Sequence, residues 1–66
     1  MPFIKIEAGK MSKEQKAKLQ AGFTKVASET LGIEEEHFTV LIKENDLDNW
    51  GVGGKCLSDM LANRNQ

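Results

Sequence analysis

The chain has 66 residues, 39% of them hydrophobic, and a net charge of -1 from 9 Lys+Arg and 10 Asp+Glu. This near-neutral balance, with three Phe and one Trp, argues against a nucleic-acid partner, which would favour a basic stripe and stacked aromatic side chains. No apolar run approaches the roughly 20 residues of a membrane span, and Lys5 and Glu7 interrupt the apolar start. We therefore expect a cytoplasmic protein with no signal peptide and no membrane partner.

A chain of this length forms one small domain, 1–66, which buries only about 60% of the surface exposed by the unfolded chain. Cys56 and His37 are the only cysteine and histidine. One copy can therefore build neither an internal disulfide nor the usual Cys/His zinc set, and we expect no metal site. Association with further copies is the expected source of stability, and the single cysteine is compatible with a reducing compartment.

The first predicted element is a strand over 3–7, FIKIE, with Ile4 and Ile6 on one face. Pro2, directly before it, has two interpretations. Proline is tolerated at the start of a strand, where its missing N–H costs no ladder bond. Alternatively, removal of Met1, which we expect in the cell because proline is small, leaves Pro2 with a free secondary amine.

A helix is predicted over 13–31, because Ser12 and Gln15 form a capping-box pattern. Within it, Gly22 is interpreted as a small residue that permits close packing on a sheet. Gly32 is interpreted as the residue that ends the helix. The apolar positions recur at +3 and +4 spacing and form an approximate stripe: Leu19, Phe23, Val26, Ala27, Thr30 and Leu31.

The second predicted strand is FTVLIKE, 38–44, with Phe38, Val40 and Ile42 on one face. Leu41 on the other face indicates that both sides of the strand are at least partly covered. Strand, helix and strand predict a right-handed β-α-β unit with two parallel strands. One helix leaves one sheet face bare, so we expect that face to pack on another copy.

The remaining sequence predicts a polar turn over 45–49 and a short hairpin at 50–54, WGVGG. The glycines do not form a phosphate loop, because the GxxxxGK[ST] pattern is missing and the stretch does not lie between a first strand and its helix. Residues 57–63 are expected to form a turn of helix or to pack on a neighbour. Residues 63–66 are expected to fray.

Three features thus occur in one short chain: Pro2 before a strand, a helix start Ser-x-Glu-Gln-Lys at 12–16, and WGVGG at 50–54. From Pro2 to about Asp59 the chain resembles the 4-oxalocrotonate tautomerase family of very small enzymes. The resemblance implies an α/β (α+β) fold: a β-α-β unit with a two-stranded parallel sheet and a C-terminal β-hairpin. It further implies a homo-oligomer that dimerises sheet to sheet, or a hexamer built as a trimer of dimers.

The resemblance also implies an isomerase that catalyses keto–enol proton transfer on a small-molecule substrate, with Pro2 as general base and no cofactor. An α-amino group has a reference pKa of about 7.7–8.0, and apolar surroundings or positive charge would lower it. A base with a pKa near the working pH is efficient. The apolar walls would come from Ile4, Ile6, Val40 and Trp50 if the fold brings them close.

The sequence departs from the founding members where they hold a dicarboxylate with two arginines. Met11 and Thr39 stand at those positions, and the only arginine is Arg64, so the bidentate carboxylate grip is missing. We expect Lys10 and Lys43 to supply positive charge, or else to be ordinary surface lysines. Thr39 is either a hydrogen-bond donor to substrate or an ordinary strand threonine.

Trp50 stands where the family often has an aromatic residue, so it either lines the pocket or packs in the hairpin. The missing arginines favour a 2-hydroxy-dienoate or enolpyruvate-type acid with one carboxylate, and 2-hydroxymuconate-type diacids are expected to be poor substrates. Two other functions stay open: a non-catalytic oligomeric binding protein, and a dehalogenase or hydratase with a water-activating carboxylate. For the second, Asp46 and Asp48 are available but are interpreted as turn residues.

Overall fold

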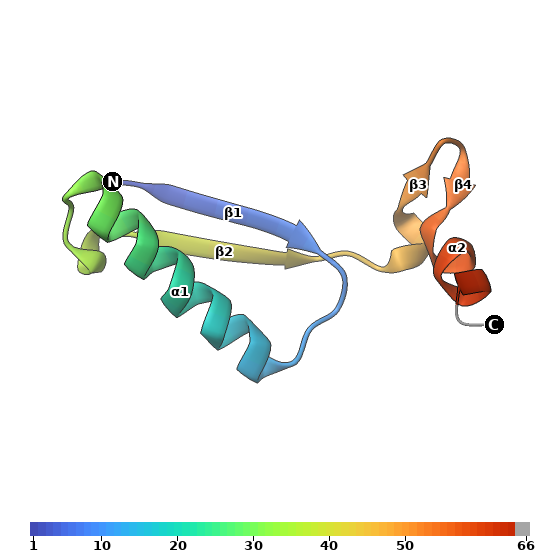
Figure 1. Cartoon of the computed structure of the whole chain (residues 1–66), viewed down its shortest axis with the longest axis horizontal. Helices are drawn as coiled ribbons and strands as arrows, with labels where there is room; N and C mark the ends of the chain where they lie inside the picture. Colours follow the sequence, from blue (N-terminus) through green and yellow to red (C-terminus); the bar gives the residue numbers. More distant parts are fainter. Residues whose placement is uncertain (65–66) are drawn as a thin grey trace.

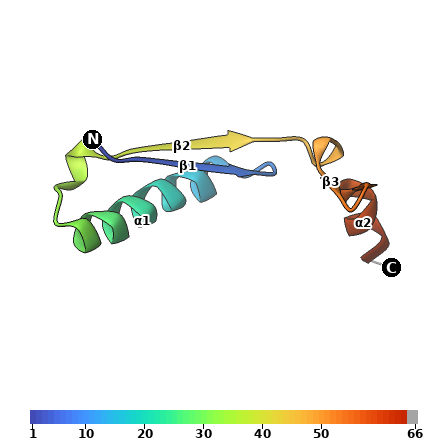
Figure 2. The same cartoon turned by 90° about the horizontal axis from the view of Figure 1, so that it is seen from above.

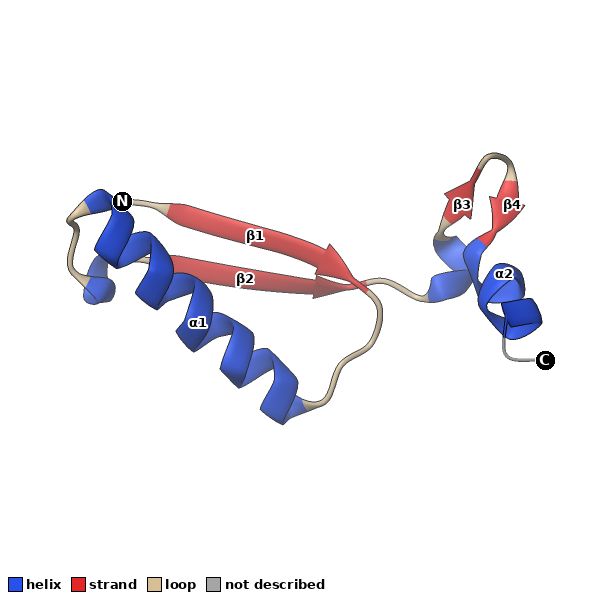
Figure 3. Cartoon of the chain, in the orientation of Figure 1, coloured by secondary structure: helices blue, strands red, loops and turns tan. Residues whose placement is uncertain are grey.

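The computed structural model describes residues 1–64 and is drawn in Figure 1. In chain order its strands and helices are β1 (Phe3–Ala8), α1 (Lys13–Leu31), β2 (Thr39–Glu44), β3 (Gly51–Val52), β4 (Lys55–Cys56) and α2 (Leu57–Arg64). Single 3-10 turns at Glu35–His37 and Leu47–Asn49 precede β2 and β3. The predicted β-α-β unit and C-terminal hairpin are both confirmed, as the colouring by secondary structure shows (Figure 3).

The sheet consists of β1 and β2 in parallel, in a register that runs from Phe3 opposite Thr39 to Ala8 opposite Glu44. Helix α1 has the predicted bounds because capping residues define both of its ends. At its start the Ser12 side chain accepts from the backbone N–H of Gln15 at 3.1 Å, and the Gln15 side chain accepts from the Ser12 N–H at 3.0 Å. At its end Gly32 has φ 70°, the left-handed conformation that favours glycine.

The face of α1 toward the sheet differs from the predicted stripe. Its half-buried residues are Lys16, Leu19, Phe23, Thr24, Ala27 and Ser28. Val26 and Leu31 are instead 63% and 58% exposed, because the helix turns these positions away from the strands. The prediction that Gly22 permits close packing on the sheet is also wrong within one chain, since a Cβ added there meets nothing within 4 Å.

One face of the sheet is covered and the other is bare. Figure 2 shows α1 on one side of β1 and β2, and the alternate residues on that side, such as Ile4 and Val40, are half-buried. On the opposite side Phe3 is 60% and Leu41 is 47% exposed, so the predicted partial cover of Leu41 is absent from the single chain. No side chain described in residues 1–62 is fully buried, so one copy has no hydrophobic core of its own.

The residues 47–64, here called the C-terminal unit, project beyond the sheet (Figures 1 and 2). Its hairpin turns at Gly53 and Gly54, with φ 61° and 82°, the two positive values of a type I′ turn. The radius of gyration of 15.5 Å exceeds the roughly 11 Å of a compact chain of this length, and the molecule extends over 45 × 24 × 16 Å. Helix α2 continues to Arg64, so fraying is not seen at 63–64, and 65–66 lie outside the described residues. Within residues 1–64, no helix is long and apolar enough to cross a membrane.

Candidate active site

Pro2 and Thr39 lie together at the N-terminal end of the sheet. The backbone N–H of Thr39 donates to the Pro2 carbonyl at 3.2 Å, and Thr39 is the register partner of Phe3. Pro2 is half-buried, whereas Met1 is 94% exposed. While Met1 is attached, the Pro2 nitrogen is an amide without a basic lone pair. Removal of Met1 would free a secondary amine on Pro2 at this end of the sheet.

The other candidate residues lie toward the opposite end. Lys43 stands one position before the end of β2, opposite Glu7, and Lys10 follows the end of β1. Trp50 belongs to the C-terminal unit, which Figure 1 shows beyond the ends of both strands. Since β1 has six residues, its length places about 20 Å between these two ends. A single chain therefore does not bring Trp50 to Pro2, and the wall predicted from Trp50 is missing there.

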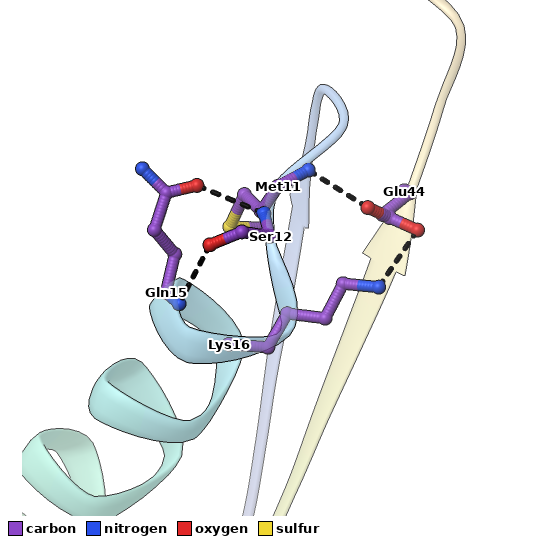
Figure 4. Close-up of polar contacts among 5 residues, drawn as sticks. All are labelled: Met11, Ser12, Gln15, Lys16 and Glu44. Atoms are coloured by element: carbon purple, nitrogen blue, oxygen red, sulfur yellow. Dashed lines mark hydrogen bonds and ion pairs between the residues drawn. The ribbon is translucent and has the colours of Figure 1, made fainter.

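A carboxylate that the sequence did not single out organises the loop before α1. Glu44 at the end of β2 accepts from the backbone N–H of Met11 at 2.8 Å and pairs with the Lys16 ammonium at 3.0 Å (Figure 4). The hydrogen bond from Met11, the bond and charge of Lys16, and then the charge of Lys10 lower the pKa of Glu44. These contacts hold the loop, and with it Lys10 and Met11, against the end of β2. Sequence spacing gave no signal for them, because they join positions far apart in the chain, 33 residues in the case of Met11 and Glu44.

The lysines of this end all have anionic neighbours. The charge of Lys10 acts on Glu44, and Lys10 lines a hollow of about 370 Å³ together with Asp46, Leu47 and Ser58. Lys43 is the register partner of Glu7, whose carboxylate lies 3.9 Å from the Lys5 ammonium. This distribution of charge offers single, partly compensated ammonium groups instead of a bidentate guanidinium pair.

Trp50 is half-buried beside a second hollow, of about 290 Å³. The residues that line this hollow are Glu7, Asn45, Asn49, Trp50 and Gly51. The indole N–H donates to the Asn45 carbonyl at 3.4 Å, which ties the aromatic ring to the end of β2. An apolar ring beside amides can cover a small acid and exclude water from one side of it.

The remaining polar candidates have local structural contacts. The Asp46 side chain accepts from the Asp48 N–H at 3.2 Å, as the interpretation as turn residues predicts, and the Asp48 carboxylate accepts from the Ser58 hydroxyl at 2.5 Å. His37 is exposed in the 3-10 turn before β2. Cys56 is half-buried with its Sγ 3.2 Å from the Ser58 hydroxyl. Within residues 1–64, no group of three or more metal-ligating side chains gathers at one point.

Comparison with known proteins connects this arrangement to a family. The family model described as "Tautomerase enzyme" matches residues 2–60. The chain belongs to the tautomerase family. Its match begins at Pro2, and a tautomerase-type, isomerase function follows from membership.

Individual relatives agree with this family. The "Probable tautomerase K2" of Dickeya dadantii (strain 3937) is 39% identical over 61 residues, which cover 89% of this chain and 91% of that protein. The "2-hydroxymuconate tautomerase" of Bacillus subtilis (strain 168) is 38% identical over 61 residues, with 91% and 98% covered. The crystal structure of TomN, a 4-oxalocrotonate tautomerase homologue in the tomaymycin biosynthetic pathway, superposes with a TM-score of 0.87 at 31% identity over 92% of this chain and 95% of that one.

Proposed function

We propose that the chain is a cofactor-independent keto–enol tautomerase in which Pro2, freed by removal of Met1, is the general base. The observation that carries this proposal is the position of Pro2: it is the first residue of the family match and directly precedes β1. The amine would take the proton of an enol hydroxyl while the double bond shifts to form the carbonyl. The resulting prolinium then returns the proton to carbon, so substrate and product are isomers.

The complete site requires more than one copy. Pro2 and Thr39 lie at one end of the sheet, whereas Lys10, Lys43 and Trp50 lie toward the other. Antiparallel packing of two bare sheet faces would place the far end of one copy against Pro2 of the next, and would also cover Phe3 and Leu41. We therefore propose a homo-oligomer, either a dimer or a trimer of dimers. The lack of fully buried side chains in one copy supports this, because a single chain buries too little apolar surface for independent stability.

The proposed substrate is an acid with one carboxylate, of the 2-hydroxy-dienoate or enolpyruvate type. Lys10 and Lys43 each offer one ammonium, and Thr39 offers a hydroxyl. The Bacillus subtilis relative is named for 2-hydroxymuconate, a diacid. We expect that diacid to be a poorer substrate here, because Met11 and Thr39 stand where the founding members have arginines and offer no bidentate guanidinium. The carboxylates of Glu44, Asp46 and Glu7 also stand at the same end of the sheet as the lysines. The cytoplasmic location remains a prediction.

The test is turnover of a simple arylenolpyruvate by the processed chain and by Pro2→Ala. Because a positioned general base contributes about 10²–10⁴-fold, and alanine keeps an amine without the rigid ring, we expect kcat/KM to fall about 100-fold. The same assay on 2-hydroxymuconate should give a lower kcat/KM than the monoacid. If the processed wild type and Pro2→Ala both bind ligand without turnover, the chain is a non-catalytic binding protein instead. The missing arginines at Met11 and Thr39 are the observation that favours this second function.

A further inference from the structure

A chain of hydrogen bonds connects the end of β1 to the indole of Trp50 through one residue, Asn45. Its backbone N–H donates to the Ala8 carbonyl at 2.7 Å. Its side-chain Nδ2 donates to the Glu7 carboxylate at 3.2 Å. Its carbonyl accepts from Trp50 Nε1 at 3.4 Å. Asn45 is thus held on two sides by β1 and holds Trp50 with its third group.

We propose that Asn45 is a positioning residue that sets where the C-terminal unit presents Trp50. The inference rests on the proposed function, in which Trp50 lines a site completed by Pro2 of another copy. The chain leaves β2 directly before Asn45, so the orientation of this one residue directs the whole C-terminal unit. A half-buried indole N–H needs an acceptor, and the Asn45 carbonyl provides it only while the Asn45 peptide keeps its present orientation.

A packing contact restricts the same junction from another side. A Cβ added at Gly9 would lie 3.2 Å from Leu47 Cδ2, so the turn after β1 lies directly against the first residue of the C-terminal unit. This apolar contact limits how closely the unit approaches β1 but has little directional preference. The directional part of the restraint is supplied by the two hydrogen bonds to β1, from the Asn45 backbone to the Ala8 carbonyl and from the Asn45 side chain to Glu7. Only the second of these can be removed by a side-chain substitution.

The first variant is Asn45→Ala, which removes only the bond to Glu7, because the other two bonds use the backbone. Trp50 is the only tryptophan, so the fluorescence of the assembled protein reports on this ring alone. We expect a red-shifted emission and a KM for arylenolpyruvate that is about fivefold higher. A fivefold change corresponds to the loss of about 1 kcal/mol, the typical contribution of one hydrogen bond. The kcat and its pH profile should stay unchanged, because the base at Pro2 is not altered.

Variants of Glu7, which accepts the hydrogen bond from the Asn45 side chain, supply the decisive comparison. Glu7→Ala should reproduce the red-shifted emission of Asn45→Ala, whereas Glu7→Gln keeps an acceptor oxygen and should restore the wild-type emission. The emission and not KM is compared here, because Glu7 lines the Trp50 hollow and stands opposite Lys43. In the double variant Glu7→Ala/Asn45→Ala the two emission shifts should not add, because both substitutions break the same hydrogen bond. Glu29→Gln on the exposed face of α1 controls for loss of one negative charge. Glu7 is exposed, so its substitution should leave the fold intact. The comparison of Glu7→Ala with Glu7→Gln therefore tests the proposal even if Asn45→Ala does not fold.

Three results would overturn the proposal: wild-type emission and KM in Asn45→Ala, independent addition of the two alanine variants, or a fall in kcat with KM unchanged. Failure of the proposed function has a different signature. If Pro2→Ala turns over arylenolpyruvate as fast as the wild type, Pro2 is not the base. The emission of the Glu7 and Asn45 variants would still show whether that bond places Trp50.

Discussion

Glu44 is the residue whose ionisation bears most directly on the loop that carries Lys10 and Met11. Its pKa is lowered in the folded chain by the Met11 N–H and by Lys16. Because the folded pKa lies below the unfolded one, the stabilising effect is present above the unfolded pKa. It is lost as the pH falls through the folded pKa.

We therefore expect Glu44→Gln to lower the urea midpoint at pH 7, with a difference from wild type that shrinks as the solution is acidified below the unfolded pKa. Unfolding followed by far-UV circular dichroism at one fixed protein concentration measures this, since assembly makes stability depend on concentration. Glu36→Gln, at an exposed position before β2, is the matched control. A difference that persists or grows in acid would show that the Glu44 carboxylate does not hold the loop.

At the scale of elements, two glycines allow the same substitution to be tested with opposite expected signs. Gly22 lies in α1 with open space around an added Cβ, so Gly22→Ala should stabilise by about 0.5–1 kcal/mol. Gly54 has φ 82° in the hairpin turn, so Gly54→Ala should destabilise by about 1–2 kcal/mol. Chemical denaturation of both variants checks this. Destabilisation by Gly22→Ala would mean that a neighbouring copy packs closely on that turn of α1.

The bounds of the elements were predictable where the signal is local. Ser12, Gln15 and Gly32 act on their own neighbours, so α1 begins and ends as predicted. The predicted second strand starts at Phe38, one residue early, because Phe38 still donates its N–H to the Glu35 carbonyl of the preceding 3-10 turn. The exposure of Val26 was not predictable, because the rotation of a helix on its sheet depends on tertiary packing.

The site was predictable only in part for the same reason. Pro2 and Thr39 come together because parallel pairing of two predicted strands brings them to one end. The direction of the C-terminal unit depends on Asn45, whose bonds to Glu7 and Ala8 join positions far apart in the sequence. Periodicity carries no information about such contacts, so the separation of Trp50 from Pro2 appeared only in three dimensions.

At the scale of the whole molecule, the bare sheet face is the surface on which assembly is expected to depend. Leu41→Glu places a charge in the middle of this face and should shift the protein from oligomer to monomer, with loss of cooperative unfolding and of turnover. Sedimentation velocity over a range of concentrations measures the assembly. Glu29→Lys on the outer face of α1 is the control and should assemble normally. An intact oligomer in Leu41→Glu would place the contacts between copies elsewhere.

The central claim, that a free amine on Pro2 is the base, is tested most directly at the N-terminus. Intact-mass spectrometry of the protein purified from its own cells should show a chain that lacks Met1, and that sample should turn over arylenolpyruvate. A preparation that retains Met1 should assemble equally well and show no Pro2-dependent turnover, because its proline nitrogen is an amide. A native protein that keeps Met1, or equal turnover by the two forms, would contradict the account.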